Sequence, residues 1–156
     1  MRIESGRNTV SAVCATVVLG ASMALVAIGQ AEDPDLDWQA VQAVCGRCHG
    51  PALFQNKPRS WERWNDVFAD MTQRGATGTD EQLMRVTRYF LENLTLVNVN
   101  KSPADELAGV LGVSEDVAQS IITRRQQHPF ANLTELRAVP GVDPEKLEKR
   151  KSRILF

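Results

Sequence analysis

The chain has 156 residues and a formal net charge of −1, with 43% hydrophobic and 24% charged residues. This length accommodates one domain or two very small ones, and the composition is typical of a soluble globular protein. The sequence contains two histidines, His49 and His128, and shows no Ser/His/Asp set, phosphate-binding loop or paired-carboxylate site. Few side chains are therefore available for acid–base catalysis. The near-zero net charge neither favours nor excludes an anionic partner.

The first 31 residues have the features of a secretory signal peptide. Arg2 and Arg7 precede an uncharged apolar run over residues 10–28, and small residues follow at Gly29 and Ala31. This order predicts cleavage after Ala31 and a periplasmic location. The apolar run is long for a signal peptide, so the alternative is an uncleaved anchor in the cytoplasmic membrane.

The sequence C-G-R-C-H at residues 45–49 has the spacing of a c-type haem attachment site. Two thiols so placed can reach the two vinyl groups on one edge of a porphyrin, and His49 can ligate the iron. A C-x-x-C pair also occurs in thioredoxin-like redox sites, which have a βαβ context, and in zinc sites, which need two further ligands. The Cys and His residues outside the motif are Cys14, in the predicted signal peptide, and His128.

Residues 32–96 predict three helices. The first carries both cysteines of the motif on its apolar face and is broken at Gly50-Pro51. Residues 52–59 predict a loop before the second helix. The helix starts are marked by capping residues, namely Asp35 or Asp37 for the first helix, Ser60 for the second, and Thr79 with Gln82 for the third.

The second helix, which Gly75 ends, places Met71 on the same face as Trp64 and Phe68. If these aromatic side chains pack on a haem, the Met71 thioether can reach the second axial position of the iron. The other interpretation is that Met71 only fills the core. Met84, which falls between the apolar stripes of the third helix, and His128 are the remaining candidates for this ligand.

The segments C-G-R-C-H-G and R-S-W-E-R-W-N-D-V-F-A-D-M-T-Q-R-G-A, with a helix ending Y-F-L, resemble a small class I type cytochrome c. They are most similar to the haem-binding domains found with quinohaemoprotein dehydrogenases, over residues 38–94. This resemblance implies one covalent haem c per chain and an electron-carrying role between a dehydrogenase and a respiratory chain. The implied site residues are Cys45 and Cys48 as thioether sites, His49 as proximal ligand and Met71 as distal ligand.

Residues 97–156 contain an internal repeat. L-A-G-V-L-G-V-S at 107–114 aligns with L-R-A-V-P-G-V-D at 136–143. Each copy predicts a helix, a tight turn and a second helix. The expected helix starts are Ser102-Pro103, Ser114, Asn132 with Glu135, and Asp143-Pro144. Because neither helix pair can bury its apolar side alone, the two copies are expected to pack face to face.

The segments V-N-V-N-K-S-P-A-D-E-L and L-T-E-L-R-A-V-P-G-V-D resemble the double helix-hairpin-helix of the competence-protein DNA-receptor family. They also resemble the small extrinsic subunit of photosystem II, which shares this fold. The resemblance makes Gly112 and Gly141 candidate phosphate contacts. However, DNA-binding members usually have a second glycine in the turn, and here Ser114 and Asp143 occupy that position. Residues 97–156 also contain nine Lys or Arg and eight Asp or Glu, so they have no clear excess of positive charge. DNA binding is therefore the alternative to protein docking or a structural role.

The sequence thus predicts an all-α protein with a signal peptide (1–31), a cytochrome c haem domain (32–96) and a double helix-hairpin-helix domain (97–156). We expect a periplasmic monohaem cytochrome that exchanges electrons with a redox partner protein, with the second domain for docking or positioning. One alternative is an exported DNA-binding protein with an accessory haem domain. Another is a haem enzyme such as a peroxidase, which needs an open distal position. Membrane contact is expected only for an uncleaved signal.

Overall fold

The structure, a computed structural model, describes residues 34–156. These residues belong to one compact unit, Glu32–Phe156. The predicted signal peptide at residues 1–31 lies outside the described part. Within residues 34–156, no helix has both the length and the apolar character needed to cross a membrane.

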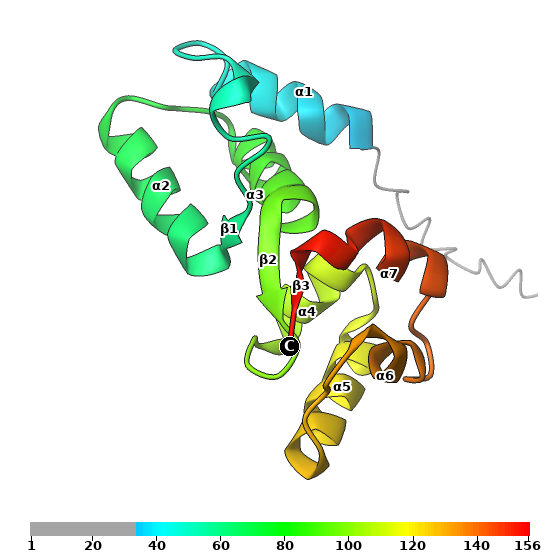
Figure 1. The fold of residues 1–156 in the computed structure, drawn as a ribbon. Helices are drawn as coiled ribbons and strands as arrows, with labels where there is room; N and C mark the ends of the chain where they lie inside the picture. The colour runs from blue at the N-terminus through cyan, green and yellow to red at the C-terminus, as the bar shows by residue number, and fades with distance from the viewer. Residues whose placement is uncertain (1–33) are drawn as a thin grey trace, which may run out of the picture. The chain divides into compact units, whose positions relative to one another are not determined.

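The described part is mostly helical, as predicted, and also contains a small sheet. Its helices are α1 (Pro34–Val44), η1 (Pro51–Leu53), α2 (Trp61–Gln73), α3 (Asp80–Leu94), α4 (Ala104–Leu111), α5 (Glu115–Gln127), α6 (Leu133–Arg137), α7 (Pro144–Arg150) and η2 (Lys151–Arg153). Its strands are β1 (Arg59–Ser60), β2 (Thr95–Asn98) and β3 (Ile154–Leu155). Figure 1 shows α1, α2 and α3 in the upper part of the view and α4, α5 and α6 below them, with β2 between.

The helix starts at Ser60 and Thr79 were predicted correctly. The Ser60 side chain accepts a hydrogen bond from the Arg63 backbone N–H, and Thr79 and Gln82 form a complete capping box. Gly75, which follows α2, has a φ of 96° and so adopts the left-handed conformation that favours glycine. These local signals therefore set the limits of α2 and the start of α3.

The prediction for α1 was wrong at both ends. Asp35 and Asp37 do not cap it, because α1 begins at Pro34 and both lie in its first turn. The helix ends at Val44, and residues 45–48 form turns that are followed by a bend at residue 49. A Cβ atom on Gly46 would lie 2.4 Å from the Gln42 carbonyl oxygen, so the close turn after α1 requires a glycine there.

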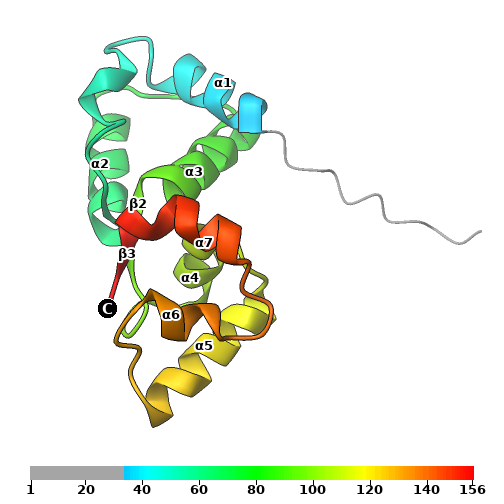
Figure 2. The same cartoon turned by 45° about the vertical axis from the view of Figure 1, so that its right-hand side comes forward.

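The sheet was not predicted. The segment expected to be a polar–apolar link contains the central strand β2, which pairs in parallel with β1 on one side and β3 on the other. Arg59 lies opposite Thr95, and Val97 lies opposite Ile154. In Figure 2, the last strand of the chain again lies beside β2. The sheet thus connects the segment before α2 with the end of the chain.

Two hydrophobic clusters make up the core. The first gathers side chains of α1, α2 and α3 around Trp64, which is 1% exposed and donates its indole N–H to the Leu94 carbonyl oxygen at 3.0 Å. The second contains side chains from both copies of the repeat, including Leu107 and Leu136, which are fully buried. The two copies therefore bury their apolar sides against each other, as expected.

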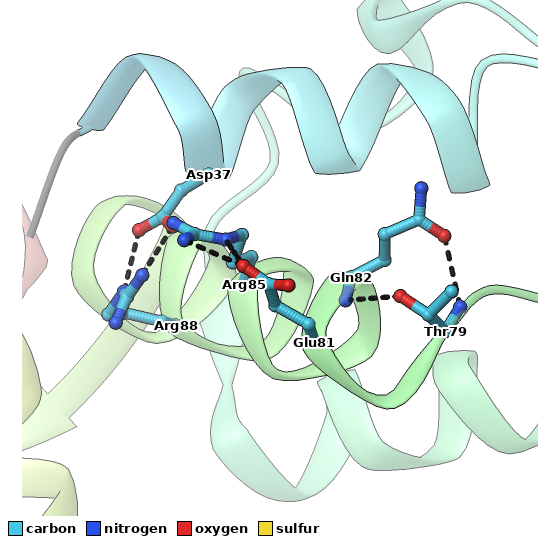
Figure 3. A network of polar contacts seen from close by, with 6 residues as sticks. All are labelled: Asp37, Thr79, Glu81, Gln82, Arg85 and Arg88. Atoms are coloured by element: carbon cyan, nitrogen blue, oxygen red, sulfur yellow. Dashed lines mark hydrogen bonds and ion pairs between the residues drawn. The ribbon is translucent and has the colours of Figure 1, made fainter.

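One buried ionic network joins α1 to α3. The Asp37 carboxylate is 5% exposed and accepts hydrogen bonds from Arg88 Nε at 2.7 Å and from Arg85 Nη1 at 3.3 Å. Figure 3 shows both guanidinium groups reaching from α3 to this one carboxylate. The hydrogen bond from Arg88 holds the pKa of Asp37 below its usual value of 3.8, against the opposing effect of burial. The carboxylate therefore stays ionised at neutral pH.

Replacing Asp37 with asparagine should lower the free energy of unfolding by about 2 kcal/mol, because two partly buried guanidinium groups lose their anion. Since the pKa of Asp37 is lower in the folded state, its stabilising contribution is fully present above pH 3.8 and is lost as the pH falls through the folded-state pKa. The difference in the free energy of unfolding between wild type and Asp37→Asn, measured in urea, should therefore become smaller at acidic pH.

Asp66→Asn is the control for this comparison. It breaks an exposed ion pair with Arg63, so it should change the free energy of unfolding by less than about 1 kcal/mol.

Candidate functional site

A largely apolar cavity of about 710 Å³ lies among the end of α1, the residues before α2, and helices α2 and α3. Its size falls within the range of sites for small molecules and cofactors. The aliphatic and aromatic side chains that line it are Val44, Leu53, Phe54, Trp64, Val67, Phe68, Ala76, Leu83, Val86 and Phe90. Four candidate haem-binding side chains predicted from the sequence also line it, namely Cys45, Cys48, His49 and Met71.

The two cysteines reach the cavity from the turns that follow α1. The Cys45 backbone N–H still donates to the Val41 carbonyl at 2.8 Å, so Cys45 keeps helical hydrogen bonding although α1 ends one residue earlier. Cys45 is half-buried and Cys48 is exposed. Burial raises the pKa of the Cys45 thiol, whereas a reactive redox pair needs a lowered thiol pKa.

His49 is half-buried at the wall of the cavity, with its ring edge-on to Phe54 at a centroid distance of 6.2 Å. Its Nδ1 atom is buried and has no hydrogen-bond partner in the described part of the chain. A buried polar atom without a partner costs free energy, so this imidazole is not explained as a satisfied core histidine. An imidazole with an unpartnered nitrogen, lining one cavity with two cysteine sulfurs and a thioether, fits the donor set of a haem c site.

The structure separates the three candidates for a second axial ligand. Met71, in α2, is half-buried and lines the cavity. Met84, in α3, is 65% exposed and is not among the lining residues. His128, which follows α5, is exposed and also does not line the cavity. Of these three side chains, Met71 is thus the one that shares a cavity with the C-x-x-C-H motif.

Among the cavity residues that the sequence reasoning missed are Phe54 and Arg59. Phe54 is 8% exposed, and its ring packs in a tilted arrangement against Phe90 at a centroid distance of 5.1 Å, although its segment was predicted as a loop. The sequence did hold a signal for the burial of Phe54, because a large aromatic residue followed by polar residues often packs against the core. Arg59 lies in β1, and its role in the cavity depends on a strand that the local sequence does not indicate.

The candidate phosphate contacts Gly112 and Gly141 lie in the two hairpin turns. Both have positive φ angles, 68° and 87°, so their backbones adopt the left-handed form that the tight turn needs. Each turn packs on the other copy of the repeat. A Cβ on Gly112 would meet the Arg150 guanidinium at 2.4 Å, and one on Gly141 would meet Val117 at 2.5 Å.

The second turn already has an anion of its own. The Asp143 carboxylate accepts hydrogen bonds from the Glu145 and Lys146 backbone N–H groups at 2.8 Å and 3.3 Å. These are donors that a phosphate at this turn would need, and the residue between Asp143 and Glu145 is a proline without an N–H. In the first turn, Ser114 accepts from the Val117 N–H. The start of α5 also carries two acidic residues, which repel a phosphate.

The basic residues near the end of the chain are partly neutralised. Glu148 forms ion pairs with both Arg137 and Lys151, which hold the pKa of its carboxyl group below the usual value. Arg150 turns inward and donates to the Val110 carbonyl oxygen at 2.9 Å. Two of these basic side chains therefore have a carboxylate partner and a third is directed to a backbone carbonyl, while each keeps its charge.

Comparison with known proteins finds one family. Residues 92–155 match the model described as the helix-hairpin-helix motif, which confirms this part of the prediction. The match begins within α3 and takes in β2, β3 and helices α4 to α7. No curated protein and no solved structure matches the chain. Among residues 34–156, no three His, Cys, Asp or Glu side chains are grouped so that they could hold a metal ion.

Proposed function

We propose that this chain is a periplasmic monohaem c-type cytochrome that transfers electrons to and from a partner protein. The observation that carries the proposal is that the C-x-x-C-H motif at residues 45–49 and Met71 line the same largely apolar cavity. A bound haem would supply an iron that changes between Fe(II) and Fe(III). No acid–base group is required for this role, in keeping with the scarcity of histidines.

The side chains of the cavity have distinct roles in this proposal. Cys45 and Cys48 would hold the haem through thioether bonds, and His49 and Met71 would ligate its iron. The aromatic side chains of Trp64, Phe68 and Phe90 form one connected cluster, with centroid distances between 4.7 and 6.5 Å. In this proposal the cluster keeps water away from one side of the haem. Low access of solvent raises the reduction potential of the haem iron, and so does ligation by a thioether.

The first test is expression of the exported chain with a bacterial haem-attachment system. Haem staining on a denaturing gel should give a band at the mass of the chain, because thioether bonds survive denaturation. The reduced protein should show the sharp absorbance bands of a six-coordinate c-type haem. A chain that is exported and soluble but carries no stain would contradict the proposal.

The helix-hairpin-helix module is proposed to position or dock the cytochrome rather than to bind DNA. Such motifs are linked to DNA binding, which remains the second candidate function. The positioning role is supported by the contacts of the two turns, which are made with the other repeat copy and with Asp143. The redox partner and the exported location are parts of the same proposal.

The wild-type protein should show no measurable affinity for duplex DNA in fluorescence anisotropy at 50 mM salt. A phosphate-binding protein releases counterions, so its affinity falls steeply between 50 and 200 mM salt. The most informative variant is Asp143→Asn, which removes the competing carboxylate charge from the second turn while keeping a capping side chain. A salt-dependent affinity in the wild type that increases in this variant would favour the DNA-binding alternative.

A further inference from the structure

Two arginine side chains line the cavity, Arg59 and Arg74. Arg74 pairs with Asp70, whereas none of the ion pairs within residues 34–156 involves Arg59. It lies in β1, and the parallel pairing of Arg59 with Thr95 fixes its backbone against the central strand. Its guanidinium carbon lies 5.5 Å from the centroid of the Trp64 ring. The side chain is therefore held on two sides, by the strand and by the indole, at the wall of the cavity.

The Nε atom of Arg59 is buried and has no hydrogen-bond partner within residues 34–156. Burying a guanidinium N–H without an acceptor destabilises the folded state. A bound ligand that accepts this hydrogen bond would offset the cost. Arg74 lines the same cavity but differs in both respects. Its side chain is 71% exposed and forms an ion pair with Asp70 at 2.9 Å.

We propose that Arg59 binds a carboxylate group of the ligand in this cavity. The ligand class is an apolar macrocycle with carboxylate side chains, and this rests on the proposed haem function. The aromatic and aliphatic walls would hold the ring, while the Arg59 guanidinium, with its planar set of donors, pairs with a propionate. Arg59 is thus a specificity-determining residue, because it favours the dicarboxylic acid over an esterified ring of the same shape.

The test uses the full chain expressed without a haem-attachment system, with its thiols reduced. Metal-free protoporphyrin IX and its dimethyl ester are titrated in parallel, and binding is followed by quenching of tryptophan fluorescence. The wild type should bind the diacid about ten to a hundred times more tightly than the diester, the usual worth of a hydrogen bond to a charged group. In Arg59→Gln this preference should disappear, while the affinity for the diester stays unchanged.

Two further variants make the result specific. Arg59→Lys keeps the charge but loses the fork of donors, so it should retain part of the preference. Arg74→Gln removes a cation that already has a partner, so it should retain all of the preference. If Arg59→Gln weakens the diacid and the diester equally, Arg59 only supports the fold, and the proposal is overturned. An unchanged diacid preference in Arg59→Gln, or no binding of either porphyrin to the wild type, overturns it as well.

The haem-staining experiment separates this inference from the function on which it rests. A stained wild-type chain combined with no effect of Arg59→Gln would leave the cytochrome standing and remove the role of Arg59. An unstained chain that nevertheless prefers the diacid through Arg59 would do the reverse. It would indicate a non-covalent porphyrin-binding pocket with the same carboxylate contact.

Discussion

Replacing both Cys45 and Cys48 with alanine should abolish covalent haem attachment, so that haem staining of the denatured chain falls to background. The two side chains line the proposed haem cavity, and the described residues contain no other cysteine that could form a thioether. Each single variant should keep at most one thioether bond and stain more weakly than the wild type. The measurement is staining intensity divided by the amount of chain on the same gel.

Arg47→Ala is the matched control for this experiment. Arg47 lies between the two cysteines in the sequence, is exposed, and is not among the residues that line the cavity. Its replacement should leave staining at the wild-type level. A stained band in the Cys45→Ala/Cys48→Ala double variant would show that the C-x-x-C-H motif does not attach the group.

Replacing Met71 with alanine should remove the weak near-infrared sulfur-to-iron charge-transfer band from the oxidised haem protein. The midpoint potential should fall as well, since a thioether ligand favours Fe(II) and its loss removes this preference. The cavity wall would also lose a long side chain, so the iron should become open to added cyanide. Absorbance spectra and a potentiometric titration measure these three effects on one sample.

Met84→Ala should leave the band, the potential and the cyanide response unchanged, because Met84 is 65% exposed and does not line the cavity. Loss of the band in Met84→Ala, with Met71→Ala retaining it, would mean that α3 and not α2 supplies the ligand. If the wild type lacks the band and neither variant changes the spectrum, neither methionine ligates the iron.

The helices of this chain were predictable where their limits are encoded in a few neighbouring residues. Ser114, Asn132 and Asp143 cap α5, α6 and α7 as the sequence indicated, because a capping side chain bonds to backbone groups two or three residues away. The end of α1 was misjudged because the apolar spacing continues through Cys48 while the chain turns at Gly46. Periodicity alone does not reveal where a backbone leaves the helix.

The small sheet could not be found in this way. Each of its edge strands has two residues, too few for an alternating pattern, and β2 is paired with segments distant in the sequence. The motif at residues 45–49 could be picked out as a candidate site because its residues are consecutive, whereas the place of Arg59 beside the cavity could not be predicted. Its position in the cavity results from its pairing with Thr95, which is a tertiary contact.

The parallel sheet also places a constraint on the time course of folding. Val97 and Asn98 pair with Ile154 and Leu155, so one edge of β2 stays open until residues 154 and 155 have been made and can fold. During that interval β2, which contains the buried Val97, exposes unpaired backbone groups, the kind of edge that other chains can pair with. Removing Ile154 and Leu155 would make this interval permanent. A shortened chain should therefore aggregate even with every residue of the cavity intact.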